Sequence, residues 1–329
     1  MMRRLFGIVL LAFAASAAVV GQQTAPRVPR NAAEFDELFQ QVSNWSRWGK
    51  DDQLGSANLV TAAKRKQAIA LARDAVSVSL AHNPLTERAD DNPSPFEHSM
   101  NPAVSRPLQV SLVDTYKVSY HGYAHSHIDA LCHIFHEGRI FNGYSAETVT
   151  AHGATRLGIH HLQSGIVTRG VLLDVPALRG TDALEPGEPI FPDDLEAAEE
   201  RAGLQVGPGD ALLVRTGRWR WRDEHGPWDL GRQAAGLDAS CLPWLRQRDV
   251  ATLGSDGVSD VLPSRVDGVA MPIHTVTIVV LGVHLMDNLD LDTLGTACGE
   301  EGRWEFLFTV APLVLRRGTA SPVNPIAVF

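Results

Sequence analysis

Histidine is distributed unevenly along this chain, and its clustering constrains the fold more than any other feature. Eight of the 13 histidines lie between His121 and His161. The densest part, from His121 to His136, holds five of them together with Asp129. Imidazole and carboxylate groups are the side chains that most often bind transition metals and move protons in catalysis. The sequence therefore predicts a fold that gathers part of this segment into a site.

Spacing within the segment indicates which side chains meet. If residues 121–129 form a strand, every second side chain lies on one face. If the chain turns helical at Asp129, His133 follows one turn later on the same face. Together the two elements would bring four side chains to one place: His125, His127, Asp129 and His133. Such a ligand set is suited to Zn, Mn or Fe(II). A solvated histidine-rich loop is the alternative, and the regular intervals with an aspartate among them argue against it.

The first 21 residues have the pattern of a secretory signal peptide. Two arginines precede an apolar run from Leu5 to Val20 that ends in small residues. A membrane-spanning helix needs about 20 apolar residues, so this shorter run favours a cleaved signal over an anchor. We expect a periplasmic or secreted protein that keeps no stable membrane anchor after cleavage.

Composition favours one globular domain after this signal. Hydrophobic residues make up 44% and charged residues 20% of the 329 residues, which is typical of a folded chain. The formal net charge of −9 gives no basic surface for nucleic acid. Residues 22–44 are predicted to form a leader and an amphipathic helix capped by Asn31, and residues 45–329 the domain.

Apolar runs and helical patterns follow one another without strict alternation, which predicts an α/β domain with a mixed sheet. Strands are predicted at residues 108–113, 116–120, 170–175, 211–215 and 305–315. Helices are predicted at residues 31–43, 61–74, 193–202 and 238–248. Residues 87–105 contain three prolines and no periodicity, so we expect a long surface loop there, of a length suited to a lid.

Several catalytic motifs are missing from the sequence. There is no G-x-S-x-G, no H-E-x-x-H, no P-loop pattern and no strand-linked G-x-G-x-x-G. These absences argue against a serine α/β-hydrolase, the common zinc protease helix and a nucleotide cofactor. Cys132 could pass for a nucleophile, but its apolar neighbours favour an inert buried thiol.

The segment from His127 to His133 resembles the H-x-D-x-x-x-H core of the cyclase-like metal-dependent hydrolases, which include bacterial kynurenine formamidase and isatin hydrolase. Further segments resemble the long subgroup in the same order: 48–55, 213–217, 256–260, 272–274, 287–290 and 321–327. The resemblance covers residues 45–329 and implies a single cyclase-like domain of the swivelling β/β/α type. It also implies one or two divalent ions, Zn or Mn.

The resemblance implies a role for each matching position. Metal ligands are implied at His127, Asp129, His274 and Asp287, and a general base at His133. Binuclear relatives carry glutamate where this chain has Asp287, so a single ion is a fair alternative to two. The family's first ligand position falls on Tyr123, and we expect His121 or His125 to replace it.

Two further residues are candidates for substrate binding. His136 lies three residues after His133, and Arg215 is at the end of a predicted strand, where a structural ion pair is an equal alternative. The remaining histidines of the cluster have no convergent spacing and are expected on the surface or in structural roles. A stretch of alternating arginines and tryptophans at residues 218–222 would suit an interface.

The expected function is an exported hydrolase of small molecules. Its substrate would be a small cyclic or N-acyl amide, or a lactone, cleaved at a C–N bond other than a peptide bond in the amide case. A non-catalytic periplasmic metal-binding or sensory protein with the same fold is the alternative. A third possibility is a metal-free serine or cysteine enzyme, which rests only on Cys132. The resemblance implies a homodimer or larger homo-oligomer.

Overall fold

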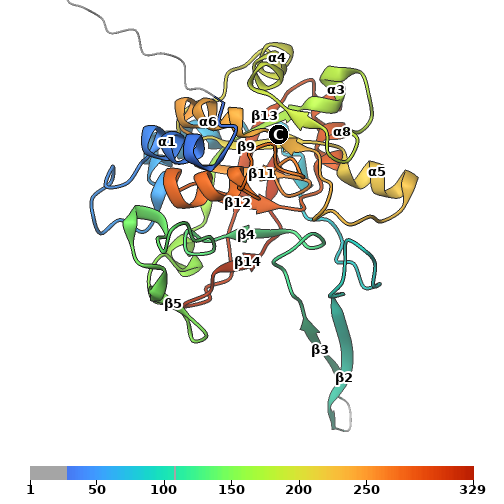
Figure 1. Ribbon diagram of the computed structural model, residues 1–329. Helices are drawn as coiled ribbons and strands as arrows, with labels where there is room; N and C mark the ends of the chain where they lie inside the picture. The colour runs from blue at the N-terminus through green and yellow to red at the C-terminus, as the bar shows by residue number, and fades with distance from the viewer. Residues whose placement is uncertain (1–27, 107–108) are drawn as a thin grey trace, which may run out of the picture.

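The fold is built on one large curled mixed sheet in a computed structural model that describes residues 28–106 and 109–329 (Figure 1). In spatial order its nine strands are β1 (Ser77–Ser79), β15 (Ile326–Val328), β13 (Glu305–Val310), β7 (Ile166–Asp174), β9 (Ala211–Arg215), β11 (Thr252–Ser255), β12 (His284–Asp287), β4 (His127–Asp129) and β14 (Ala320–Pro322). The predicted α/β fold with a mixed sheet is confirmed.

The sheet is parallel at its centre and antiparallel at both sides. β7, β9, β11 and β12 run parallel, and the strands beyond them pair antiparallel. Parallel strands are covered on both faces, so their sequences are continuously apolar. β9 shows this, because its residues from Ala211 to Val214 are all buried. β12 and β4 therefore meet where the parallel centre gives way to an antiparallel edge.

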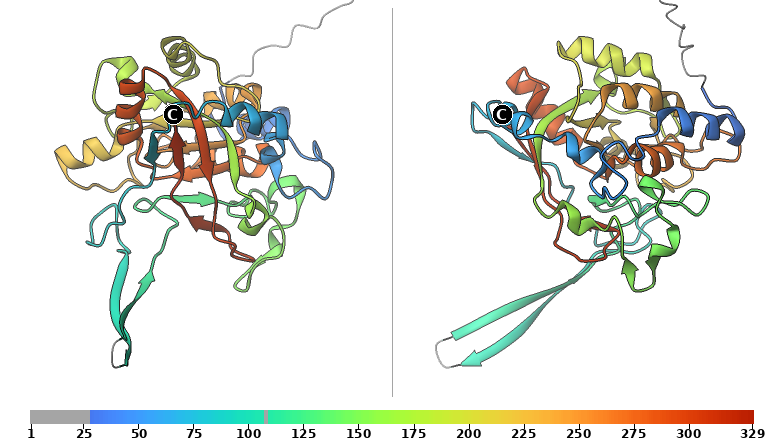
Figure 2. Two further views of the ribbon diagram at one scale, coloured as in Figure 1. Left: turned by 180° about the vertical axis from the view of Figure 1, so that it is seen from behind. Right: turned by 90° about the vertical axis from the view of Figure 1, so that its left-hand side faces the viewer.

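Helices lie around this sheet (Figures 1 and 2). They are α1 (Ala32–Val42), α2 (Ala62–Ile69), α3 (Val175–Arg179), α4 (Pro192–Ala202), α5 (Arg218–His225), α6 (Leu242–Arg248), α7 (Pro272–His274), which continues into a π-helix (Thr275–Leu281), and α8 (Leu291–Glu301). Short 3₁₀ turns occur at Gly55–Leu59, Phe141–Gly143, Ala146–Thr148, Ile159–Leu162 and Ala239–Cys241. None of the helices in the described residues has both the length and the hydrophobicity that a membrane-spanning helix requires.

The predicted N-terminal helix is present as α1 and belongs to the domain core. Asn31 accepts a hydrogen bond from the backbone N–H of Glu34 at 3.1 Å, which caps the helix. Phe35 and Leu38 on its apolar face are buried among residues of the central sheet and α6. The predicted signal peptide, residues 1–21, lies outside the described residues.

The predicted loop at residues 87–105 is wrong in its second half. β2 (Glu97–Arg106) and β3 (Gln109–Lys117) form one long antiparallel hairpin, in which β3 replaces the two separate strands expected at 108–120. A register shift at Pro102 lets the strand accommodate its proline. The hairpin projects away from the body (Figures 1 and 2), so it is no lid over the sheet. Two smaller pairs, β8 (Pro189–Ile190) with β10 (Gly236–Leu237) and β5 (Val149–Thr150) with β6 (Gly153–Ala154), complete the strands.

Candidate metal centre

β4 places two candidate ligands in the buried part of the sheet. It pairs with β12 on one side and β14 on the other, and His127 lies directly opposite Asp287 of β12. Residues opposite one another in register share a face of the sheet, as do alternate residues of one strand. His127, Asp129 and Asp287 therefore point to the same side. All three are buried.

Asp129 is at the centre of the candidate site. Its Oδ1 lies 3.2 Å from Nδ1 of His121 and 3.6 Å from Nε2 of His127, and its Oδ2 lies 3.9 Å from Nε2 of His133. Burial opposes ionisation of this carboxyl, but His121 and the two other imidazoles outweigh burial and hold its pKa well below the usual range. Asp129 is therefore a carboxylate at neutral pH.

Two overlapping groups of side chains have the geometry of cation sites. One is His121, Asp129 and His133; the other is His127, Asp129 and Asp287; within each group the donor atoms lie within 4.8 Å of one another. Oδ1 of Asp129 and Oδ1 of Asp287 are buried and make no hydrogen bond. Buried carboxylate oxygens without a donor are costly unless a cation satisfies them. The donor set fits one divalent ion, or two that share Asp129.

His274 approaches the second group from α7. Its Nε2 lies 3.1 Å from Oδ2 of Asp287, and its Nδ1 lies 2.6 Å from Oδ2 of Asp260. Burial lowers the affinity of this imidazole for a proton, but Asp287 and Asp260 together raise its pKa well above the ordinary value. A carboxylate on one ring nitrogen fixes the imidazole so that the other nitrogen faces the site. Asp260 has this function for His274.

His133 reaches the site from a turn. The predicted helix beginning at Asp129 is wrong, because the chain forms only a turn, in which the N–H of His133 donates to the carbonyl oxygen of Ala130 at 3.0 Å. The imidazole stacks on that of His121 with ring centroids 4.0 Å apart. Burial lowers the pKa of His133 to about 4, although Asp129 acts in the opposite direction. The ring is neutral at pH 7 and can accept a proton.

The sequence profile of the family described as "Putative cyclase" matches residues 50–260, more than half of the chain. The chain belongs to the cyclase family. Its fold is similar to a crystal structure described as a novel cyclase, with 26% identity over 88% of this chain and 99% of that chain and a TM-score of 0.80.

The cyclase fold also occurs in more distant structures. Isatin hydrolase A from Ralstonia solanacearum is 20% identical over 80% of this chain and 95% of that chain, with a TM-score of 0.53. An isatin hydrolase bound to the product analogue thioisatinate is 16% identical over 82% of this chain and 99% of that chain, with a TM-score of 0.54. At these identities the likeness shows the fold alone. A search of curated protein sequences found no match.

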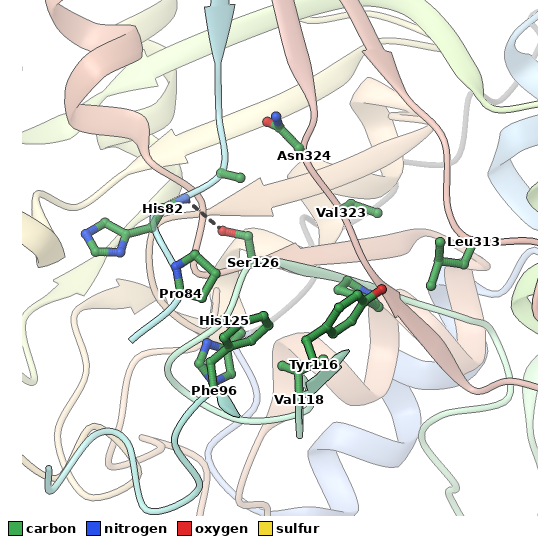
Figure 3. A pocket seen from close by; sticks show the side chains of 12 residues that line it. His82, Pro84, Phe96, Tyr116, Val118, His125, Ser126, Leu313, Val323 and Asn324 are labelled. Atoms are coloured by element: carbon green, nitrogen blue, oxygen red, sulfur yellow. Dashed lines mark hydrogen bonds between the residues drawn. The ribbon is translucent and has the colours of Figure 1, made fainter. Parts of the chain in front are cut away.

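In this cyclase-family chain, the loop before β4 decides which histidine joins the site. The predicted strand over residues 121–129 is limited to His127–Asp129, and the loop before it is irregular. Asn288 donates from Nδ2 to the carbonyl oxygen of Gly122 at 2.8 Å and lies 3.3 Å from that of His125. This anchoring leaves His121 beside Asp129. His125 instead lines an apolar pocket with Phe96 and is outside both groups (Figure 3).

Arg218 holds the same loop from α5. It donates to the carbonyl oxygen of Tyr123, pairs with Asp91 at 3.0 Å, and lies over the ring of Trp219 at 3.8 Å. Burial lowers the pKa of Arg218 to about 10. The expectation that this arginine–tryptophan stretch is an exposed interface is wrong for Arg218 and Trp219, because both are buried.

Neither predicted substrate-binding residue joins the cluster. His136 contacts α1, with its Nε2 3.2 Å from Oδ1 of Asp36 and its ring against Phe39. Arg215 pairs with Asp174 at 2.8 Å and with Asp292 at 2.7 Å, which is the structural alternative. Both side chains have partners elsewhere.

Two residues that support the candidate metal centre were not predicted from the sequence. Asp260 lies in a matched segment but showed no spacing that would link it to His274. His284 is buried and its Nδ1 lies 2.8 Å from the carbonyl oxygen of Asp129, so it supports β4 from the neighbouring strand. Side chains alternate between the two faces of a strand, so His284 of β12 lies on the opposite face from Asp287. This alternation indicates that His284 packs behind the site and does not join it.

Proposed function

We propose that this cyclase-family protein is an exported, metal-dependent hydrolase that cleaves a small cyclic or N-acyl amide, or a lactone. The observation that carries the proposal is the pair of overlapping histidine–aspartate groups around Asp129, with two buried carboxylate oxygens that have no hydrogen-bond donor. Family membership and the fold shared with proteins named isatin hydrolases support it. Export is inferred from the signal-like first 21 residues.

In this proposal residues of four segments, the loop before β4, β4, β12 and α7, would hold the metal. His121 from the loop and His127 and Asp129 from β4 form the main ligand set. Asp287 and His274 complete a second position that shares Asp129. A Zn or Mn ion bound there supplies Lewis-acid polarisation of the substrate carbonyl and makes a water molecule more acidic.

His133 then acts as the general base. Its ring is neutral, lies beside the candidate ligands and keeps about a quarter of its side chain exposed (28%). An imidazole in this position takes a proton from the attacking water and returns it to the leaving nitrogen or oxygen. Cys132 does not compete for the role of nucleophile, because burial raises the pKa of its thiol to about 12.

The direct test is metal analysis of purified protein followed by an amide and lactone panel with and without chelator. We expect bound Zn or Mn, turnover of at least one substrate class, its loss on chelation, and its return when the metal is restored. Asp129→Asn should abolish both metal and turnover, while the exposed His152→Gln should change neither. Bound metal without chelator-sensitive turnover would overturn the proposal in favour of a metal-binding or sensory protein.

A further inference from the structure

A pocket of about 330 Å³ lies where the β2–β3 hairpin joins the body of the protein (Figure 3). Its walls include Phe96 and Val118, which flank the two strands of the hairpin, and Pro322 of β14 with the next residue, Val323. None of the described residues that line it belongs to either candidate metal group. The pocket therefore needs an explanation of its own.

The pocket is mostly apolar, and most of its polar side chains already have partners. Ser126 donates from Oγ to the carbonyl oxygen of Asn288 at 2.7 Å, and Asn324 accepts a hydrogen bond from Ser79 at 2.7 Å. The ring of His82 points away from the pocket (Figure 3). Among the described residues that line it there is no carboxylate, lysine or arginine. A charged ligand would lose its hydration there without gaining an ion pair.

His125 is the polar residue of this pocket that stays unsatisfied. It is 5% exposed, and neither ring nitrogen has a hydrogen-bond partner in the described part of the chain, although the backbone of Ser94 lies near the ring. The imidazole meets Phe96 edge to face, with ring centroids 6.3 Å apart. The hydroxyl of Tyr116 differs, because that residue is 57% exposed and water reaches it.

Buried ring nitrogens without a partner are costly to the folded state. A water molecule would be a poor partner for them, because a buried water needs two to four polar neighbours and these walls are apolar. A larger molecule meets both conditions when it offers one polar group to the imidazole and apolar surface to the walls. The pocket is large enough for such a molecule, since about 150 Å³ is enough for benzene.

We propose that this pocket binds a small uncharged cyclic molecule whose one hydroxyl or amide group bonds to a ring nitrogen of His125. The ring of the ligand packs against Phe96 and Val118 and buries apolar surface there. An imidazole can donate from one nitrogen and accept at the other. A hydroxyl also does both, so it suits either position of the ring proton. The proposal does not depend on the proposed hydrolase activity, because other residues bind the metal.

Isothermal titration calorimetry with phenol and toluene tests the polar contact, because the two molecules have the same shape and only phenol has a hydroxyl. We expect phenol to bind with a Kd of about 0.1–1 mM. Toluene should bind about tenfold more weakly, which corresponds to the loss of one hydrogen bond. His125→Leu should remove this preference and keep the binding of toluene, which also shows that the variant folds.

A second pair of variants tests the location of binding. Val118→Trp fills the pocket and should abolish the binding of both molecules. The matched control is Val113→Trp, the same change at a residue of β3 that is 44% exposed and does not line the pocket. It should bind both molecules as the wild type does. Circular dichroism checks that the two tryptophan variants fold.

Absence of phenol binding, or equal affinities of the wild type for phenol and toluene, would overturn the proposal. A tenfold preference that persists in His125→Leu, or phenol binding that Val118→Trp leaves unchanged, would do the same. Phenol that binds only to the metal-loaded protein would belong to the metal centre, which also contradicts the proposal. A protein that is inactive on the amide and lactone panel would leave these results unchanged, so the two proposals fail separately.

Discussion

Two neighbouring stretches of this chain carry four histidines each and use them differently. In the first, residues 121–133, three of the four imidazoles lie around one buried carboxylate, Asp129. In the second, residues 136–161, the histidines are spread over an α1 contact, an exposed turn and a 3₁₀ turn. His160 and His161 touch each other, at a centroid distance of 4.3 Å, but belong to neither candidate metal group of the described residues.

The difference lies in the backbone that carries the side chains. β4 is held between two strands, so Asp129 has a fixed, dry position that gives nearby imidazoles a common target. The second stretch consists of turns, short 3₁₀ segments and the small β5–β6 pair. His152 is exposed there, the other three histidines are half-buried, and the carboxylate beside His136, that of Asp36, is exposed. The density of histidine therefore indicates where in the sequence the candidate site lies. The buried carboxylate on a sheet strand determines which of these histidines take part in it.

The largest expected effect comes from removing that carboxylate's charge. Asp129→Asn replaces the ligand shared by both groups with an amide of the same shape, so bound metal and turnover should fall to background. His161→Gln in the second stretch should retain both. Elemental analysis of the two purified variants measures their bound metal. Equal metal content in the two variants would show that the two stretches do not differ in metal binding.

The next effect separates catalysis from metal binding within the first stretch. His133→Ala should lower kcat by about 10²–10⁴-fold, the usual contribution of a general base, while metal content stays near that of the wild type. Steady-state kinetics and elemental analysis on the same sample decide the role. Loss of metal in this variant would make His133 a ligand, as its place beside Asp129 also allows.

A smaller effect is expected from the residue that orients His274. Asp260→Asn removes the charged partner of Nδ1, and changes to such supporting groups typically weaken metal affinity by about 10–100-fold. Competition titration with a chromophoric chelator measures this change. An unchanged affinity would mean that His274 is not a ligand, since its orientation would then not matter.

The smallest effect concerns pH and the metal-free protein. Burial lowers the pKa of His133 to about 4 in the folded state, below the ordinary value of about 6.5 in the unfolded chain. The unfolded chain then binds the proton first as pH falls, so this residue destabilises the fold below about pH 6.5. Between about pH 7 and pH 5 the free energy of unfolding should fall by about 1–2 kcal/mol more in the wild type than in His133→Gln.

Urea denaturation at several pH values gives that difference directly. Comparison with His133→Gln removes the opposing contributions of His274 and Asp256, whose pKa values are raised, the latter to about 6 by burial. Parallel pH profiles for the two proteins would show that His133 is solvated in the folded state.

The sequence located the histidine–aspartate groups more closely than the elements that carry them. The H-x-D-x-x-x-H spacing led to Asp129 and its neighbours, although the expected helix at Asp129 is a turn. Spacing could not choose between His121 and His125, because hydrogen bonds from Asn288, 163 residues away in sequence from His125, set the loop. The mixed sheet followed from irregular alternation. In the β2–β3 hairpin, β3 was predicted as two separate strands, while β2 was missed because the prolines before and within it indicated a loop.

A crystal structure of the manganese-loaded protein, with anomalous scattering used to place the ion, tests the central claim most directly. We predict a peak within about 2.0–2.3 Å of a carboxylate oxygen of Asp129, with His127 and His121 as further ligands and His125 still in its apolar pocket. A manganese ion bound elsewhere while Asp129 stays free of metal, or one held by His125 in place of His121, would contradict it.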